Sequence, residues 1–99
     1  MQISLIGGLD RLQRHYREEA QKLGIELRVY NTAETNLAAK VSHCQAVLLL
    51  TGKISHRARR EVMKVARAQR IPVSMSHQCG VCAVRDCLNC LQQQGATRS

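Results

Sequence analysis

Aromatic residues and long apolar runs are both scarce in this sequence. Phe and Trp are absent, and Tyr16 and Tyr30 are the only aromatic residues, so the stacking platforms that hold single-stranded nucleic acid are missing. The opening segment MQISLIGGLDR has neither the charged start nor the apolar run of a signal peptide, and no segment is long and apolar enough to cross a bilayer. We therefore expect a cytoplasmic protein that does not bind a membrane.

Acidic residues are also few. Seven Asp and Glu residues stand against fifteen Lys and Arg residues, which gives a formal net charge of +8 and a pI near 9.9. This balance favours anionic partners, among them nucleic acid, nucleotides and phosphorylated metabolites. The length of 99 residues suits one domain. We expect a single α/β domain over residues 1–91, followed by a polar C-terminal tail over residues 92–99.

Strand and helix patterns alternate along the chain. Apolar segments bounded by turn residues predict strands at 3–7, 25–30, 46–50 and 72–76. Helical spacing predicts a helix after each strand, with Gly24 ending the first, and with Asn36 and Ser55 capping the second and third. Because right-handed crossovers join parallel strands, this order predicts a three-layer sandwich with a four-stranded parallel sheet of order 2-1-3-4, a Rossmann-like fold.

Ligands of such sheets collect at the carboxyl ends of the strands, where the strand order reverses. The turns that follow the predicted strands bring small and polar residues to this edge. The residues that we expect to bind a small anionic ligand there are Gly7, Gly8, Arg11, Lys53, Ser55 and His56. The Gly7-Gly8 pair suits either an anion cradle or a plain tight turn, since the full dinucleotide fingerprint needs a third glycine, and here the glycines stop at two.

The segment GGLDRLQRHYREEAQKLG, followed after an apolar strand by SHRA at 55–58, resembles the bacterial family called domain of unknown function 2325. The resemblance covers roughly the whole chain. It implies a Rossmann-like fold with no settled biochemical activity. The pocket residues that it implies are Gly7, Gly8, Arg11, Ser55 and His56. The cysteine-rich segment near the end of the chain departs from the family pattern.

Four of the five cysteines lie in the segment HQCGVCAVRDCLNC, residues 77–90. On the predicted last helix the apolar side chains share one arc and form a buried stripe, which leaves the thiols on the outward face. This stripe consists of Val81, Val84, Leu88 and Leu91. Outward thiols beside a histidine indicate a soft metal, as zinc or an iron–sulfur centre. The predicted metal ligands are Cys79, Cys82, Cys87, Cys90 and His77.

One straight helix cannot close this site around one ion. Cys79 and Cys87 would lie about 12 Å apart along it, too far to share a tetrahedral zinc ion with Zn–S bonds of about 2.3 Å. An unwound segment, ligands shared with His77 or Cys44, or a second copy of the chain would each solve the problem. The last solution predicts a homodimer joined near the last helix, and in such a dimer the thiols could also be simple interface packing.

A thiol-redox role is the alternative for the pair Cys79 and Cys82. A C-x-x-C motif at the start of a helix that follows a strand is the setting of thiol-disulfide oxidoreductases. Against this role, the fourth strand is the wrong place for the motif in a thioredoxin fold, and the sole proline, Pro72, offers no cis-proline partner. The thiol-redox interpretation of these cysteines therefore ranks below the metal-site interpretation.

A basic stripe occupies the predicted third helix, and its members are Arg57, Arg60, Lys64 and Arg67. It would bind phosphates of nucleic acid or form a solvated face, and we expect no tight nucleic-acid binding at physiological salt. No set of nucleophile, base and orienting acid emerges, so binding or sensing is favoured over catalysis. The leading hypothesis is a metal-thiolate or redox-responsive binding protein. A thiol-disulfide oxidoreductase and a nucleotide- or nucleic-acid-binding accessory protein are the alternatives.

Overall fold

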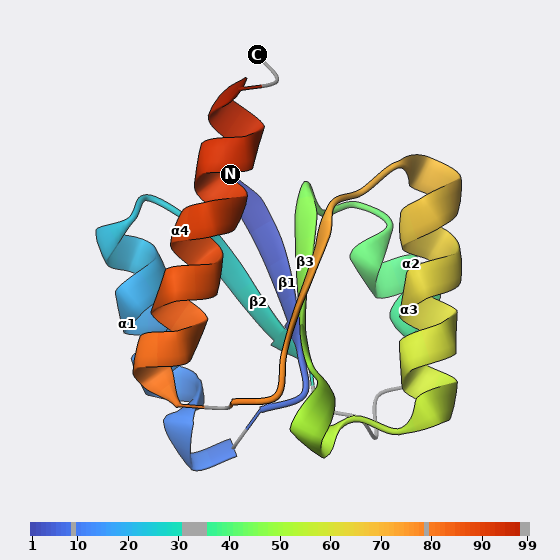
Figure 1. Cartoon of the computed structure of the whole chain (residues 1–99), viewed down its shortest axis with the longest axis horizontal. Coiled ribbons are helices and arrows are strands. Elements are labelled where there is room, and N and C mark those ends of the chain that lie inside the picture. The colour runs from blue at the N-terminus through green and yellow to red at the C-terminus, as the bar shows by residue number, and fades with distance from the viewer. Residues whose placement is uncertain (9, 31–35, 79, 98–99) are drawn as a thin grey trace.

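The computed structural model describes residues 1–8, 10–30, 36–78 and 80–97. Strands lie at the centre of the molecule, with helices on both sides (Figure 1). The strands are β1 (Gln2–Ile6), β2 (Glu26–Tyr30), β3 (Ala46–Leu50) and β4 (Val73–Ser76). The helices are α1 (Gln13–Lys22), α2 (Leu37–Val41), α3 (His56–Gln69) and α4 (Val81–Thr97), and two 3-10 turns are η1 (Asp10–Leu12) and η2 (Thr51–Lys53).

The four strands form one parallel sheet in the order β2-β1-β3-β4. This order, the parallel pairing and the alternation of strands with helices confirm the predicted α/β sandwich. Ile3 on β1 is in register with Leu27 on β2 and with Ala46 on β3, so β1 is an inner strand. Met75 on β4 is in register with Leu49 on β3. The strands β2 and β4 therefore form the two edges of the sheet.

Helices α1 and α4 cover one face of the sheet, and α2 and α3 cover the other (Figure 1). Each face has its own apolar core. The core beneath α1 and α4 includes Leu5, Tyr16, Leu48, Val84 and Leu88. The core beneath α2 and α3 includes Ile6, Leu37, Val41, Leu49 and Val62. Strand β3 is buried along its whole length because its successive side chains enter the two cores alternately.

The ends of the helices follow local sequence signals only in part. Ser55 caps α3 as predicted, since its Oγ accepts a hydrogen bond from the backbone N of Ala58 at 3.2 Å. The prediction that Asn36 caps α2 was wrong about its side chain. Asn36 does precede this helix, but its backbone is left-handed, with φ of 57°, and its side chain makes no capping hydrogen bond.

Helix α4 is longer than the sequence pattern predicted. It continues to Thr97, so residues 92–97, which we expected in a polar tail, are helical. The side chain of Gln92 connects this extension to the end of α1, because its Nε2 donates to the carbonyl oxygen of Leu23, the C-cap residue of α1. The end of α4 projects beyond the sheet (Figure 1). Among the described helices, none combines the length and apolar character needed to span a membrane.

Candidate functional site

The double glycine after β1 forms a tight turn at the carboxyl edge of the sheet. Gly7 and Gly8 have φ of +91° and +89°, which side chains other than glycine rarely adopt. The backbone N of Gly7 donates to the carbonyl oxygen of Tyr30 at 3.0 Å. A Cβ atom on Gly7 would lie 3.0 Å from the carbonyl oxygen of Leu50. Because this amide is already bonded within the edge, the geometry favours the turn interpretation over an anion cradle.

The turns after β3 and β4 are joined by polar contacts. Thr51 Oγ1 lies 2.8 Å from Nδ1 of His77 and donates to the carbonyl oxygen of Ser76 at 3.4 Å. The backbones approach so closely that a Cβ atom on Gly52 would lie 2.9 Å from the carbonyl oxygen of His77. His77, predicted as a metal ligand, therefore has one ring nitrogen engaged with Thr51 and keeps only Nε2 for a further partner.

The other residues predicted to bind a ligand at this edge do not form one site in the described part of the structure. Arg11 lies in η1 with an exposed side chain, and Lys53 lies in η2, with a side chain outside the described part of the structure. Ser55 uses its hydroxyl to cap α3. His56 starts α3 and lines a groove along that helix rather than the turn between β1 and α1.

This groove, which we call the α3 groove, runs between helix α3 and the edge strand β4 and has a volume of about 610 Å³. Its lining consists of four arginine or lysine side chains, one histidine and two methionines. The lining residues are His56, Arg59, Arg60, Met63, Lys64, Arg67 and Met75. A shallower hollow of about 440 Å³ shares Met63 and Arg67 with it and continues past Arg70 to Pro72. The basic surface therefore follows the length of α3.

The sequence grouped part of this lining as a basic stripe but predicted no groove. Three of the four residues in the predicted basic stripe, Arg60, Lys64 and Arg67, line the groove, whereas Arg57 does not belong to its lining. Sequence reasoning missed Arg59 and both methionines. A signal was present, since nearly half of the fifteen Lys and Arg residues lie between Lys53 and Arg70, but this density does not show which side of the helix faces a neighbouring strand.

The cations of the α3 groove differ from the other surface cations in their surroundings. On α1, Arg14 lies 3.4 Å from Glu18, and Lys22 lies 3.5 Å from Glu19. No described carboxylate forms an ion pair with a cation of the groove. Glu61, the only acidic residue of α3, instead accepts a hydrogen bond from the backbone N of Ala38 at 3.4 Å. The positive charge of the groove is therefore not neutralised by the described part of the chain.

The edge strand β4 forms the other wall of the groove. It pairs with β3 on one side, and its other side is the open edge of the sheet. Met75 lines the groove and has 44% of its surface exposed, the one large apolar residue so exposed among the described residues. The opposite edge strand, β2, carries the charged residues Glu26 and Arg28. Strand β4 carries no charge.

The cysteines of α4 divide between two environments. Cys82 and Cys90 are exposed, as predicted for the outward face. Cys87 is half-buried and packs against the core beneath α1 and α4, so its placement on the outward face was wrong. The cause is its position on the helix, beside the buried stripe of Val84 and Leu88 rather than opposite to it. Cys79 lies outside the described residues.

The described part of the chain contains no cluster of three or more His, Cys, Asp or Glu residues that could hold a metal ion. Cys44 is buried and its Sγ donates to the carbonyl oxygen of Val41 at 2.9 Å. This contact gives Cys44 a packing role on the α2 side of the sheet, away from α4. A metal held by α4 would therefore need Cys79 or a second copy of the chain.

Comparisons with known proteins agree with this fold. A family model described as "Uncharacterized protein conserved in bacteria (DUF2325)" matches residues 2–91. A solved de novo designed Rossmann 2x2 fold protein is similar, with a TM-score of 0.63, 20% identity and coverage of 96% of this chain and 90% of the design. Another designed Rossmann fold protein has a TM-score of 0.61, 16% identity and coverage of 92% and 96%. These designs support the fold alone, and the chain has no match among the curated proteins.

Proposed function

The chain belongs to the family of domain of unknown function 2325, and within that family we propose that it is a binding module which holds an anionic partner in the α3 groove. The observation that carries this proposal is the convergence of Arg59, Arg60, Lys64 and Arg67 on one groove without an ion pair to a described carboxylate. Unneutralised like charges repel one another within the folded chain. An anionic partner would relieve that repulsion on binding.

The length of the groove favours an extended anion over a compact one. His56 and Arg67 are eleven helical positions apart, which corresponds to about 16 Å at a rise of about 1.5 Å per residue. A single small anion could contact only part of such a row. The row therefore suits a polymer whose charges repeat along its length.

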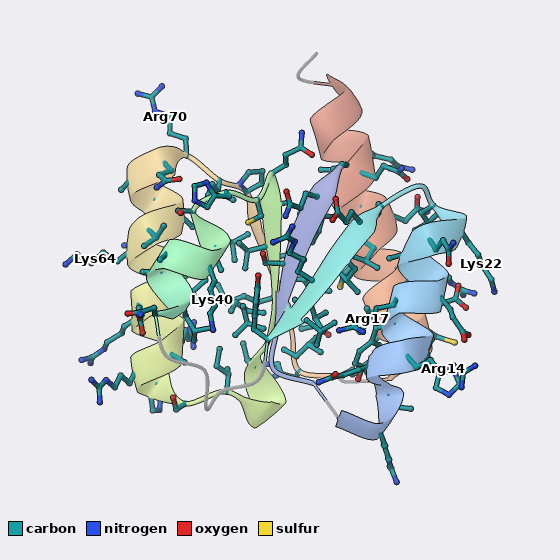
Figure 2. All side chains as sticks on the ribbon, turned by 180° about the vertical axis from the view of Figure 1, so that it is seen from behind. Arg14, Arg17, Lys22, Lys40, Lys64 and Arg70 are labelled. Atoms are coloured by element: carbon teal, nitrogen blue, oxygen red, sulfur yellow. The ribbon has the colours of Figure 1, made fainter. Side chains whose placement is uncertain are left out.

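A matched pair of charge reversals tests the proposal. The groove variant is Arg60→Glu with Lys64→Glu, and the control is Arg14→Glu with Lys22→Glu on α1, which changes the net charge by the same amount. Figure 2 shows Lys64 on one flank of the molecule and Arg14 and Lys22 on the other. The measurement is fluorescence anisotropy of a labelled DNA duplex and of labelled poly-glutamate, at several salt concentrations.

We expect the groove variant to weaken binding of both probes by at least about tenfold at low salt, because two phosphate or carboxylate contacts are lost. For the duplex, the slope of log affinity against log salt should become shallower by about two. The α1 variant should stay within about threefold of the wild type. Equal weakening by the two variants would mean that binding follows net charge rather than the groove, and would contradict the proposal.

A second candidate function is a metal-thiolate or redox-responsive site on α4. The observation that favours it is the exposure of Cys82 and Cys90 on this helix, since exposed thiols are prone to oxidation unless a metal or partner covers them. The test is elemental analysis and light scattering of protein purified under reducing, anaerobic conditions. A bound soft metal that is lost in Cys82→Ser and Cys90→Ser but kept in Cys44→Ser would support the site. Metal content near zero would contradict it.

A further inference from the structure

We infer that the partner of the α3 groove is an acidic polypeptide segment in extended conformation, which adds as a strand to the open edge of β4. This inference rests on the proposed function, because it names the class of anion that the same groove binds. Such a segment would contact the main chain of β4 as well as the cations of the groove. Changes to the β4 backbone should therefore weaken its binding even when the charge of the protein is unchanged.

The hydrogen bonds of the sheet define which backbone groups of β4 are free. The backbone N of Val47 donates to the carbonyl oxygen of Pro72 at 2.9 Å, and Val47 is in register with Val73. Since successive residues of a strand direct their N–H and C=O groups to opposite sides, Ser74 and Ser76 bond to β3. Val73 and Met75 then direct their backbone groups to the open edge.

The same two residues also point their side chains toward α3. Val73 packs against the core beneath α2 and α3, and Met75, two positions later on the same face, lines the α3 groove. A strand added beside β4 would therefore have every second side chain over Met75 and next to the cations of α3. Apolar and acidic residues at those alternate positions would complement both surfaces.

The composition of the groove favours a polypeptide over nucleic acid. Met63 and Met75 give the lining an apolar, adaptable part, which would face charged phosphates in a complex with duplex DNA. A nucleic-acid backbone also lacks the regular N–H donors and C=O acceptors that an open strand pairs with. An acidic peptide supplies carboxylates for the cations, an apolar side chain for Met75 and a main chain for β4.

Charge also argues against a second copy as the occupant. Pairing β4 with β4 of another molecule would bring two α3 grooves close together, and each chain carries a formal net charge of +8. No described carboxylate lines the groove to offset the repulsion. The backbone of β4 is nevertheless open to pairing with a segment of opposite charge. Val73–Ser76 contains no charged residue and no proline, the residues that commonly keep an open edge from pairing.

The experiment uses the full chain and a labelled peptide in which Glu alternates with Val. Met75→Pro removes the outward N–H of β4 while leaving the bonds of Ser74 and Ser76 to β3, a substitution that an edge strand tolerates. Met75→Leu is the matched control, because it keeps the N–H and an apolar side chain. A second form of the peptide carries an N-methyl group on every backbone nitrogen, which removes the donors on both of its edges without changing its charge.

We expect Met75→Pro to weaken binding of the alternating peptide by about tenfold, the effect of losing one main-chain hydrogen bond and one apolar contact. Met75→Leu should bind within about threefold of the wild type, and the N-methyl peptide should bind at least about tenfold more weakly. DNA binding should not respond to Met75→Pro. In case Met75→Pro disturbs the fold, hydrogen exchange of the wild type provides an independent measurement, in which the peptide should protect the amides of Val73 and Met75.

Three results would overturn the inference while leaving the proposed function intact. The first is peptide binding that responds to Arg60→Glu with Lys64→Glu but gives no amide protection on β4. The second is tighter binding of the DNA duplex than of the peptide, through the same cations and without protection of Met75. The third is a dimer of the free protein that Met75→Pro dissociates, since a second copy would then occupy the edge. If neither probe responds to the α3 charge reversal, the proposed function itself fails.

Discussion

Thr51 and His77, separated by 26 positions in sequence, are joined by a contact of 2.8 Å between Thr51 Oγ1 and His77 Nδ1. This contact ties the turn that leads into α3 to the turn that leads into α4. It lies at the carboxyl edge of the sheet, where the backbone of Gly52 also approaches His77. The contact therefore lies between the segment that starts α3 and the end of β4, the two elements that line the α3 groove.

Replacing Thr51 by Val removes the hydroxyl and keeps the shape of the side chain. We expect Thr51→Val to lower the free energy of unfolding by about 1 kcal/mol, the typical net contribution of a hydrogen bond, as measured by urea denaturation. The control is Ser42→Ala, which removes one local bond to the carbonyl oxygen of Ala39, three residues away, and should cost less because the Thr51 hydroxyl also contacts the part-buried carbonyl oxygen of Ser76. Equal losses would show that the contact with His77 has no special structural importance.

Gly8 should be much less tolerant of substitution than Gly24, although both have positive φ. A Cβ atom on Gly8 would lie 3.0 Å from Leu50 Cδ1 and 3.1 Å from Tyr16 Cε2, whereas a Cβ on Gly24 would have no heavy atom within 4 Å. Gly24→Ala should cost about 1 kcal/mol from its backbone alone. Gly8→Ala should cost about 3 kcal/mol because crowding is added. Thermal unfolding of the two variants distinguishes them, and similar melting temperatures would contradict the packing argument.

Arg70 ends α3 in a left-handed conformation, with φ of 57°. The backbone N of Ile71 donates to the carbonyl oxygen of Ala66 at 2.8 Å, a terminal bond of the kind that glycine commonly accompanies. Arg70→Gly should therefore raise the free energy of unfolding by about 1 kcal/mol. Arg70→Ala removes the same charge but keeps a Cβ atom, so it should give no gain. A stabilisation by both substitutions would point to charge repulsion instead of backbone strain.

The thiols should react in an order set by their exposure. Cys82 and Cys90 are exposed, Cys87 is half-buried, and Cys44 is 7% exposed. In the folded, reduced protein we expect iodoacetamide to label Cys82 and Cys90 at least about tenfold faster than Cys44, with Cys87 between them. Mass spectrometry of digested samples over time measures each rate. In urea the rates should converge, and slow labelling of Cys82 and Cys90 in the native protein would indicate that a partner covers them.

The architecture could be predicted from sequence because several signals agreed. The apolar run from Ala46 to Leu50 indicated a strand covered on both faces, Ser55 marked the start of α3, and the spacing of Val84 and Leu88 identified the buried side of α4. Each of these signals is local, and the structure confirms each one. The short helix after Asn36 was placed well, yet its cap was not, because a capping bond depends on backbone geometry that composition does not determine.

The candidate site was less accessible to sequence reasoning because it depends on neighbours that are distant in the chain. Helical spacing grouped Arg60 with Lys64, but the contribution of Arg59 follows from the side of α3 that meets β4. Met75 becomes part of the groove because β4 is an edge strand, a property of the sheet order as a whole. Likewise, the amide of Gly7 is used by Tyr30, a bond between two strands that no motif at Gly7 reveals.

The separation of the apolar interior into two cores has a consequence for how substitutions in this chain combine. The α3 groove belongs to the layer on one side of the sheet, and the thiols of α4 belong to the layer on the other. Substitutions in distant, independently packed groups usually have additive effects on stability. Substitutions on the outward face of α4 should therefore change the stability of the fold without changing the effect of substitutions in the α3 groove.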